Sequence, residues 1–189
     1  MPWPVIEKLR LRVRMSPIVV MMVLALMTAC TKQDSADRVK EFDARAQWAV
    51  QAFDAPVLTQ SQLAAMLESD DAGGVLLVDT RTEQEYRVSH LPNAVLWADF
   101  EDADPPDRVF EHARAGRPVV FYCSIGYRSG MAASRVAQLA EPQWQIFNLK
   151  GGIFQWANED RPFEGGPLVH GFDHEWSQLL RPDLRAPIE

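Results

Sequence analysis

Cys123 and the residues after it have the pattern of a reactive-thiol loop. The chain reads Cys123-Ser-Ile-Gly-Tyr-Arg128, directly after the apolar run 118–122 and before an alanine-rich stretch. A strand end followed by a helix start exposes a thiol to the positive end of the helix dipole. Gly126 lets backbone amides converge on the sulfur, and Arg128 adds a positive charge. Both favour the thiolate, so Cys123 is predicted to be a nucleophile. The alternative is an inert cysteine at a strand end.

The elements that must position this loop follow from hydrophobic patterning. Short apolar runs predict buried strands, and capped or periodic stretches predict helices. The predicted strands are 75–78, 94–97, 118–122 and 145–149. The predicted helices are 60–68, 107–115 and 129–140. This alternation indicates an α/β fold, an open parallel sheet with helices on both faces, whose sites form at the carboxyl ends of strands.

Two further groups of polar residues are candidates for a functional role. Asp79 and Arg81 follow a predicted strand, where we expect them to tie its end to neighbouring loops. His170, Asp173 and His174 have metal-ligating side chains, but three ligands without a second cluster are a weak signal. We therefore predict no metal site and interpret residues 166–189 as an extension that packs on the domain.

Three stretches of the chain resemble the rhodanese family of sulfurtransferases. Residues 78–94 match the family's Asp-x-Arg, Glu-Tyr and His-Leu-Pro signature, with Ser89 and Asn93 at two positions where glycine is usual. The second stretch is the cysteine loop, and the third is 149–156. The resemblance covers about residues 56–163 and implies a rhodanese-like domain over 56–165.

The resemblance implies sulfur transfer through a Cys123 persulfide. A thiosulfate or persulfide donor supplies the sulfur, and a thiol or cyanide accepts it, without metal or organic cofactor. The implied binding loop comprises Ser124, Ile125, Gly126, Tyr127, Arg128 and Ser129. Arg128 is expected to orient an anionic donor, and His90 to be structural. Four residues separate the cysteine from the arginine, whereas related phosphatases and arsenate reductases have five.

Two features of the loop bear on the choice of donor and on the alternative function. Ser124 stands where efficient thiosulfate enzymes of the family often carry a cation, and Ile125 and Tyr127 present an apolar mouth. These residues favour an organic persulfide or a persulfide-carrying protein partner over thiosulfate. The alternative is a non-catalytic module that binds a partner or senses redox state through Cys123.

Cys30 has the pattern of a lipid attachment site. A basic segment precedes the thirteen-residue apolar run 17–29, which is shorter than a membrane-spanning helix. The run ends in Leu-Met-Thr-Ala-Cys30, which resembles a bacterial lipobox and implies cleavage before Cys30 and its acylation. We therefore expect a signal peptide over 1–29, a tether over 30–55 with a helical stretch, and a lipid-anchored protein facing the periplasm. Thr31 after the cysteine favours the outer membrane.

Composition limits the function further. The 189 residues carry a net charge of −7, and residues 1–29 hold four basic side chains against one acidic one. The remaining residues therefore carry a net charge of −10, which argues against a nucleic-acid-binding surface. Two cysteines exclude a disulfide scaffold and a cysteine-only zinc cluster. The oligomeric state does not follow from these patterns.

Overall fold

The computed structural model describes residues 16–69, 74–97 and 107–188, without the side chains of residues 17, 19 and 23–32. The chain divides into two compact units, Met1–Asp37 and Arg38–Glu189. Helix α1 (Pro17–Gln51) begins in the first unit and ends in the second. No helix among the described residues is long and apolar enough to cross a membrane. The expected signal peptide lies mostly outside the described residues, as does the side chain of Cys30.

A five-stranded parallel sheet forms the centre of the second unit, with strand order β1-β6-β5-β2-β4. Its strands are β1 (Val57–Leu58), β2 (Leu76–Asp79), β4 (Val95–Leu96), β5 (Val119–Tyr122) and β6 (Ile146–Leu149). A separate antiparallel ladder pairs β3 (Ser89–His90) with β7 (Glu164–Gly165). Every residue of β2 and β5 is buried, as expected for strands covered on both faces.

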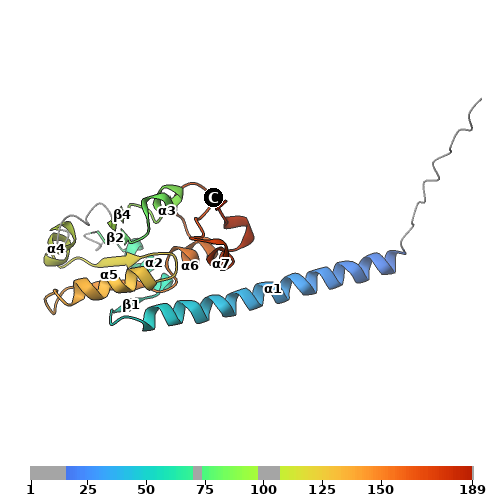
Figure 1. Ribbon diagram of the computed structural model, residues 1–189, viewed down its shortest axis with the longest axis horizontal. Coiled ribbons are helices and arrows are strands. Elements are labelled where there is room, and N and C mark those ends of the chain that lie inside the picture. Colours follow the sequence, from blue (N-terminus) through green and yellow to red (C-terminus); the bar gives the residue numbers. More distant parts are fainter. Residues whose placement is uncertain (1–15, 70–73, 98–106, 189) are drawn as a thin grey trace, which may run out of the picture. The chain divides into compact units, whose positions relative to one another are not determined.

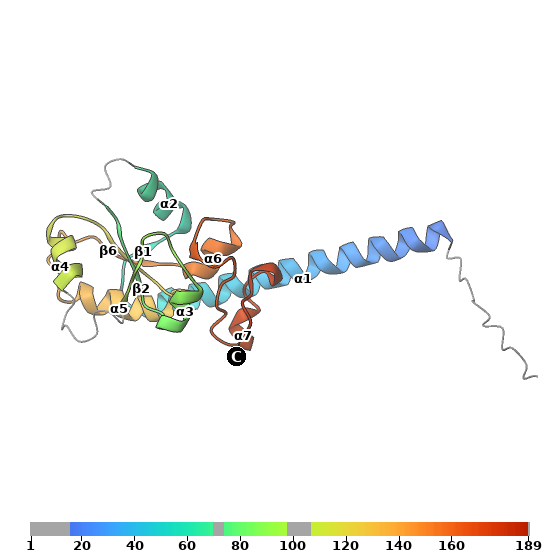
Figure 2. The same ribbon diagram turned by 90° about the horizontal axis from the view of Figure 1, so that it is seen from above.

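Helices cover both faces of this sheet, which confirms the predicted α/β class. They are α2 (Gln60–Glu68), α3 (Glu83–Val88), α4 (Asp107–Arg114), α5 (Tyr127–Ala137), α6 (Gly152–Asn158) and α7 (His174–Ser177), with a 3₁₀ turn at Pro182–Leu184. Leu77 and Val120 pack with residues of α2 and α6 in one cluster. Phe121 packs with residues of α4 and α5 in the other. Figures 1 and 2 show the central strands between these helices.

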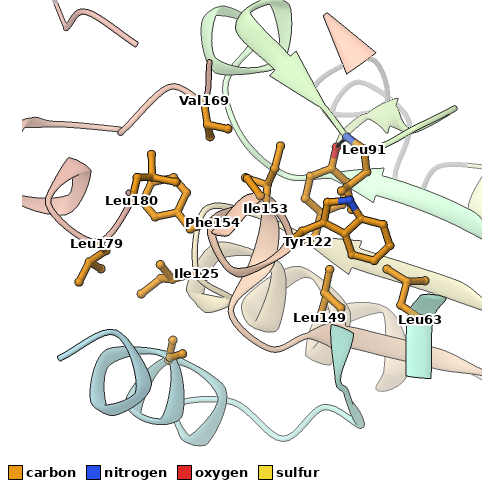
Figure 3. Packing of buried hydrophobic residues seen from close by; sticks show 14 of the residues in the cluster. Leu63, Leu91, Tyr122, Ile125, Leu149, Ile153, Phe154, Val169, Leu179 and Leu180 are labelled. Atoms are coloured by element: carbon orange, nitrogen blue, oxygen red, sulfur yellow. Dashed lines mark hydrogen bonds between the residues drawn. The ribbon is translucent and has the colours of Figure 1, made fainter. Parts of the chain in front are cut away.

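Segments on both sides of the predicted domain contribute to the first of these two clusters. Phe42, Ala46 and Ala49 of α1 are buried in it, as are Leu179 and Leu180 near the C-terminus. Figure 3 shows Leu179 and Leu180 in the same layer as side chains of α6. The compact unit begins at Arg38. The sequence analysis, in contrast, placed the start of the domain at residue 56 and assigned 30–55 to a tether.

The elements predicted from hydrophobic patterning are present, with shifted ends. Each predicted strand overlaps an observed one, and the helix predicted over 60–68 has those bounds because Thr59 and Gln62 form a capping box. Helix α5 begins at Tyr127, two residues before the prediction, because Gly126 takes the N-cap position with φ 109°. The prediction did not include β1, α3 or α6.

The order of the strands locates the site. The chain leaves β2 toward β4 on one side of the sheet and leaves β5 toward β6 on the other. Connections that diverge from neighbouring parallel strands leave a crevice beyond their carboxyl ends, where ligands bind in open α/β sheets. In β2 and β5 these ends are Asp79 and Tyr122, which are register partners. Cys123 is the next residue after Tyr122.

Candidate active site

The Cys123 loop is fixed by backbone hydrogen bonds on two sides. The sulfur accepts a hydrogen bond from the Gly126 amide, with Sγ and N 3.2 Å apart. Amides at the start of α6 donate to the loop's carbonyls: Ile153 to Cys123 at 2.9 Å and Phe154 to Ser124 at 3.1 Å. Cys123 is 1% exposed. The thiol therefore has a defined position at the junction of β5, α5 and α6.

Two glycines make this geometry possible. Gly152 has φ 49°, and a Cβ there would lie 2.1 Å from the carbonyl oxygen of Cys123. A side chain is therefore excluded by contact as well as by backbone conformation. Gly126 has φ 109°, and a Cβ there would lie 3.3 Å from the carbonyl oxygen of Leu149. Glycine at position 152 therefore permits the close approach of the cysteine loop to the start of α6, and glycine at position 126 permits the left-handed turn beside the end of β6.

Arg128 forms a paired ion bridge with Glu85 at the N-terminal end of α5. Its Nη1 and Nη2 donate to the two carboxylate oxygens of Glu85 at 2.8 and 2.7 Å. Arg128 Nη2 also donates to Ser124 Oγ at 3.1 Å, so the guanidinium connects α3 to the cysteine loop. The sequence analysis assigned Arg128 to an anionic donor, whereas in the structure a carboxylate of the protein already pairs with it.

The environment stabilises the charged form of both partners. Burial disfavours the Glu85 carboxylate, but hydrogen bonds and the charge of Arg128 outweigh it and lower its pKa to about 2. Burial likewise disfavours the Arg128 guanidinium. Its hydrogen bonds to Glu85 and its electrostatic interaction with Cys123 nevertheless raise its pKa above the usual value. Pairing with good geometry is the condition under which buried charges are tolerated.

Two of the predicted loop residues support the loop from behind. Ser129 is fully buried and donates from Oγ to Asn148 Oδ1 at 2.8 Å. Asn148 Nδ2 in turn donates to the Gly126 carbonyl at 2.9 Å. This chain of hydrogen bonds ties the first turn of α5 to β6. Ser129 and Gly126 therefore position the loop.

Asp79 and Arg81 form a buried ion pair, and His90 lies in β3, to which Arg81 is hydrogen-bonded. Arg81 Nε and Nη2 donate to the Asp79 carboxylate, with both side chains fully buried. Arg81 Nη2 also donates to the Ser89 carbonyl at 2.5 Å, which links the end of β2 to β3. His90 Nδ1 lies 3.0 Å from the Tyr86 carbonyl, and its ring stacks on that of Tyr86. Arg81 thus connects the end of β2 to β3, and His90 contacts Tyr86; the supporting roles of the three residues remain predictions.

A pocket of about 250 Å³ opens over Cys123. Besides Cys123, its lining includes four residues of the predicted binding loop: Ser124, Ile125, Tyr127 and Arg128. The other three lie far away in the sequence: Trp48 at the end of α1, Phe172 in the C-terminal segment and Trp176 in α7. The thiol is thus reached through a largely aromatic enclosure.

The sequence analysis missed Glu85, Asn148 and the three distant aromatic residues as parts of the site. A signal existed for Glu85, because Thr82 and Glu85 form a capping box that places this carboxylate in the first turn of α3. Asn148 is a lone polar residue in an otherwise apolar strand, which marks a buried side chain with a specific partner. Trp48 and the C-terminal pair gave no local signal, because only the tertiary fold places them over Cys123.

The three residues considered as metal ligands, His170, Asp173 and His174, each accept a hydrogen bond within the C-terminal segment. Asp173 caps α7 and accepts from the Trp176 amide at 2.8 Å. His170 Nδ1 accepts from the Phe172 amide at 3.1 Å. The His174 carbonyl accepts from Ser177 Oγ at 2.8 Å. These contacts order the loop that carries Phe172 and Trp176.

The Glu85 pair predicts a defined dependence of stability on pH. The folded-state pKa of Glu85 is depressed from 4.5 to about 2, so its contribution is present above pH 4.5. It is lost as the pH falls from 4.5 to 2, because the unfolded state then binds the proton more tightly. We expect this group to contribute about 3 kcal/mol of pH-dependent stability.

Denaturant unfolding at several pH values between 5 and 2 measures this contribution. We expect Glu85→Gln to be less stable than the wild type at neutral pH but to lose less stability across that range. Glu83→Gln is the matched control, since that carboxylate lies two residues away and is exposed. Identical pH slopes for the wild type and Glu85→Gln would contradict the assigned pairing.

Comparison with known proteins identifies the family. A family model described as a rhodanese-like domain matches residues 59–159, more than half of the chain. A tRNA uridine(34) hydroxylase of Bordetella avium is 32% identical over 138 residues, covering 69% of this chain and 54% of that protein. An HTH-type transcriptional regulator of Mycobacterium tuberculosis is 32% identical over 109 residues, covering 57% of this chain and 46% of that protein.

The chain spans about half the length of these curated relatives. Among solved structures, the thiosulfate sulfurtransferase of Pseudomonas aeruginosa is 21% identical with a TM-score of 0.44, covering 60% of this chain and 20% of that one. The matched residues 59–159 contain strands β2, β4, β5 and β6, the cysteine loop, Glu85 and the Gly151–Gly152 pair. The chain therefore belongs to the rhodanese-like domain family.

Proposed function

We propose that this protein is a sulfurtransferase that carries a sulfur atom on Cys123. The thiolate attacks the outer sulfur of a persulfide donor, and a bond forms between that atom and Cys123 Sγ. The donor's S–S bond breaks, and its electron pair leaves on the donor's inner sulfur as a thiolate. With thiosulfate the leaving group is sulfite. The observation that carries this proposal is the position of Cys123 at the base of a pocket, with Sγ 3.2 Å from the Gly126 amide.

The second half of the cycle returns the enzyme to its starting state. A thiolate or cyanide acceptor attacks the outer sulfur of the Cys123 persulfide, the Sγ–S bond breaks, and Cys123 leaves as a thiolate. The Gly126 amide and the N-terminal end of α5 favour the anionic sulfur in both steps. In each step one bond to the transferred sulfur forms as another breaks, so the proposed cycle includes no cofactor.

The four-residue spacing between Cys123 and Arg128 supports sulfur transfer over phosphate chemistry. The loop closes directly on α6 through Cys123 and Ser124. Arg128 is paired with Glu85, so its role in the proposal is to hold Ser124 and the shape of the loop. A tetrahedral oxyanion would compete with the Glu85 carboxylate for the same guanidinium.

Removing the thiol tests the proposal. We expect Cys123→Ser to lower the rate of thiocyanate formation from cyanide and a sulfur donor by at least about a thousandfold, because a hydroxyl cannot form a persulfide. The assay uses thiosulfate and glutathione persulfide in parallel. Cys30→Ser is the matched control, since it removes the chain's other cysteine and is expected to retain the wild-type rate.

Equal activity in the wild type and Cys123→Ser would contradict the proposal. Absence of turnover with both donors in the wild type would also contradict it and favour a binding or redox-sensing module.

We further propose that the protein is exported and held at the periplasmic face of a bacterial membrane by lipid on Cys30. The support is the sequence, in which a basic segment and a short apolar run end in the lipobox-like Leu-Met-Thr-Ala-Cys30. Thr31 favours the outer membrane in this proposal. Two or more acyl chains hold a protein stably where one chain does not.

Fractionation of bacterial cells tests the anchor. We expect Cys30→Ala to move to the soluble fraction or to accumulate as an uncleaved precursor of lower mobility, because the acyl chains are then absent. Cys123→Ala is the reciprocal control and is expected to stay with the membrane. Retention of Cys30→Ala in the membrane with its mobility unchanged would contradict lipidation.

A further inference from the structure

The pocket over Cys123 is completed by residues outside the matched family region. Trp48 precedes residues 59–159, and Phe172 and Trp176 follow them. Residues on either side of the shared domain therefore supply three of the four aromatic rings of the pocket, the fourth being Tyr127. The aromatic residues that would contact the body of a substrate therefore come mostly from the segments that flank the matched region.

Ring contacts hold these aromatic residues in place. Trp48 stacks on Tyr127, with ring centroids 4.9 Å apart and planes 6° from parallel. The Arg128 guanidinium lies 5.1 Å from the centroid of Phe172, and the Arg45 guanidinium 4.6 Å from that of Trp176. Such stacked and cation–π contacts fix ring orientation as well as adding attraction. The aromatic wall is preformed.

Phe172 has an unusual backbone conformation for its residue type. Its φ is 69°, a strained left-handed backbone region that bulky residues rarely adopt. The phenyl ring is nonetheless 49% exposed, so burial in the core does not offset the strain. Backbone strain at a pocket-lining residue is typical of a functional constraint. The position of this ring over the loop is the property that the strained backbone provides.

The charges near the pocket disfavour a small anion as the preferred donor. Arg128 is neutralised by Glu85, and Arg45 by Glu41 and Glu175. An apolar cavity of about 150 Å³ already accommodates benzene, so the 250 Å³ here has room for one or two rings. The dominant attraction available to a ligand is thus contact with aromatic surface.

We propose that the sulfur donor of this protein is an organic sulfane-sulfur compound with an aromatic body, held by Trp48, Phe172 and Trp176 with its outer sulfur at Cys123. This inference rests on the proposed sulfur transfer and specifies the donor class. For an aryl persulfide, Cys123 thiolate takes the outer sulfur and the aryl thiolate leaves with the electron pair.

A matched pair of donors tests this class. Benzenethiosulfonate and methanethiosulfonate present the same reacting anion and differ in the phenyl or methyl body. With either, Cys123 thiolate attacks the terminal sulfur, the S–S bond breaks, and a sulfinate leaves with the electron pair. Cys123 is oxidised to the persulfide level, and the sulfonyl sulfur is reduced to sulfinate. The readout is the ratio of kcat/KM for the two donors in the full chain, with cyanide as acceptor.

We expect Trp48→Ala and Phe172→Ala each to lower this ratio by about five- to tenfold, the loss expected for one aromatic contact. The rate with methanethiosulfonate should fall less than the rate with benzenethiosulfonate, and an unchanged far-UV circular dichroism spectrum shows that each variant is folded. Trp48→Phe should largely restore the ratio. Leu139→Ala truncates an exposed apolar side chain outside the pocket and should leave it unchanged. Comparing this ratio between the wild type and each variant cancels the difference in intrinsic reactivity between the two donors.

The outcomes separate this inference from the proposed function. Turnover of both donors with a ratio unaffected by the Trp48 and Phe172 variants would overturn the aromatic donor class and leave sulfur transfer intact. Absence of turnover with either donor, and with thiosulfate, would overturn sulfur transfer itself. If the alanine variants lose activity with both donors, Phe172→Leu decides, because it keeps an apolar side chain without a ring, and a wild-type ratio in this variant would contradict the inference.

Discussion

The carboxylate of Glu85 is the group on which the geometry and the charge of this site both depend. It is buried in the first turn of α3, where Glu85 forms a capping box with the N-cap residue Thr82. It accepts hydrogen bonds from both terminal nitrogens of Arg128. Without Glu85 the partly buried guanidinium of Arg128 would lose its counter-charge, and the first turn of α5 and Ser124 would lose their connection to α3. The same pairing removes most of the positive charge from the pocket. The loop is therefore well ordered but has little net attraction for a dianion.

The sheet places this pair and the thiol together. Because β2 and β5 are neighbours with register partners at Asp79 and Tyr122, the segments that follow them meet beyond one edge. The β2 side contributes α3 with Glu85, and the β5 side contributes Cys123 and α5. Helix α6 then closes on the loop from β6, and Gly152 permits the contact. Aromatic residues from both flanking segments complete the enclosure.

Most of the fold and the reactive centre could be predicted from the sequence, because both are encoded locally. Continuous apolar runs indicate buried parallel strands, and a strand, cysteine, glycine and arginine in order indicate an anion-binding turn. The partner of Arg128 could not be predicted in this way, because the electrostatic choice between Glu85 and a ligand depends on tertiary distance. Trp48, Phe172 and Trp176 escaped prediction for the same reason. Residues 38–51 were interpreted as part of a tether. Their apolar residues pack against the folded domain, and the local sequence does not reveal that packing surface.

The proposed function depends on a covalent persulfide at Cys123, which carries the sulfur atom between donor and acceptor. The most direct measurement is the mass of the intact protein after incubation with a sulfane-sulfur donor and removal of the excess, followed by peptide mapping. We expect the protein to gain the mass of one sulfur atom, located on the peptide that contains Cys123. Cyanide should remove this sulfur atom, and Cys123→Ser should not acquire it. An unchanged mass with thiosulfate, glutathione persulfide and benzenethiosulfonate, or a sulfur atom located elsewhere in the chain, would contradict it.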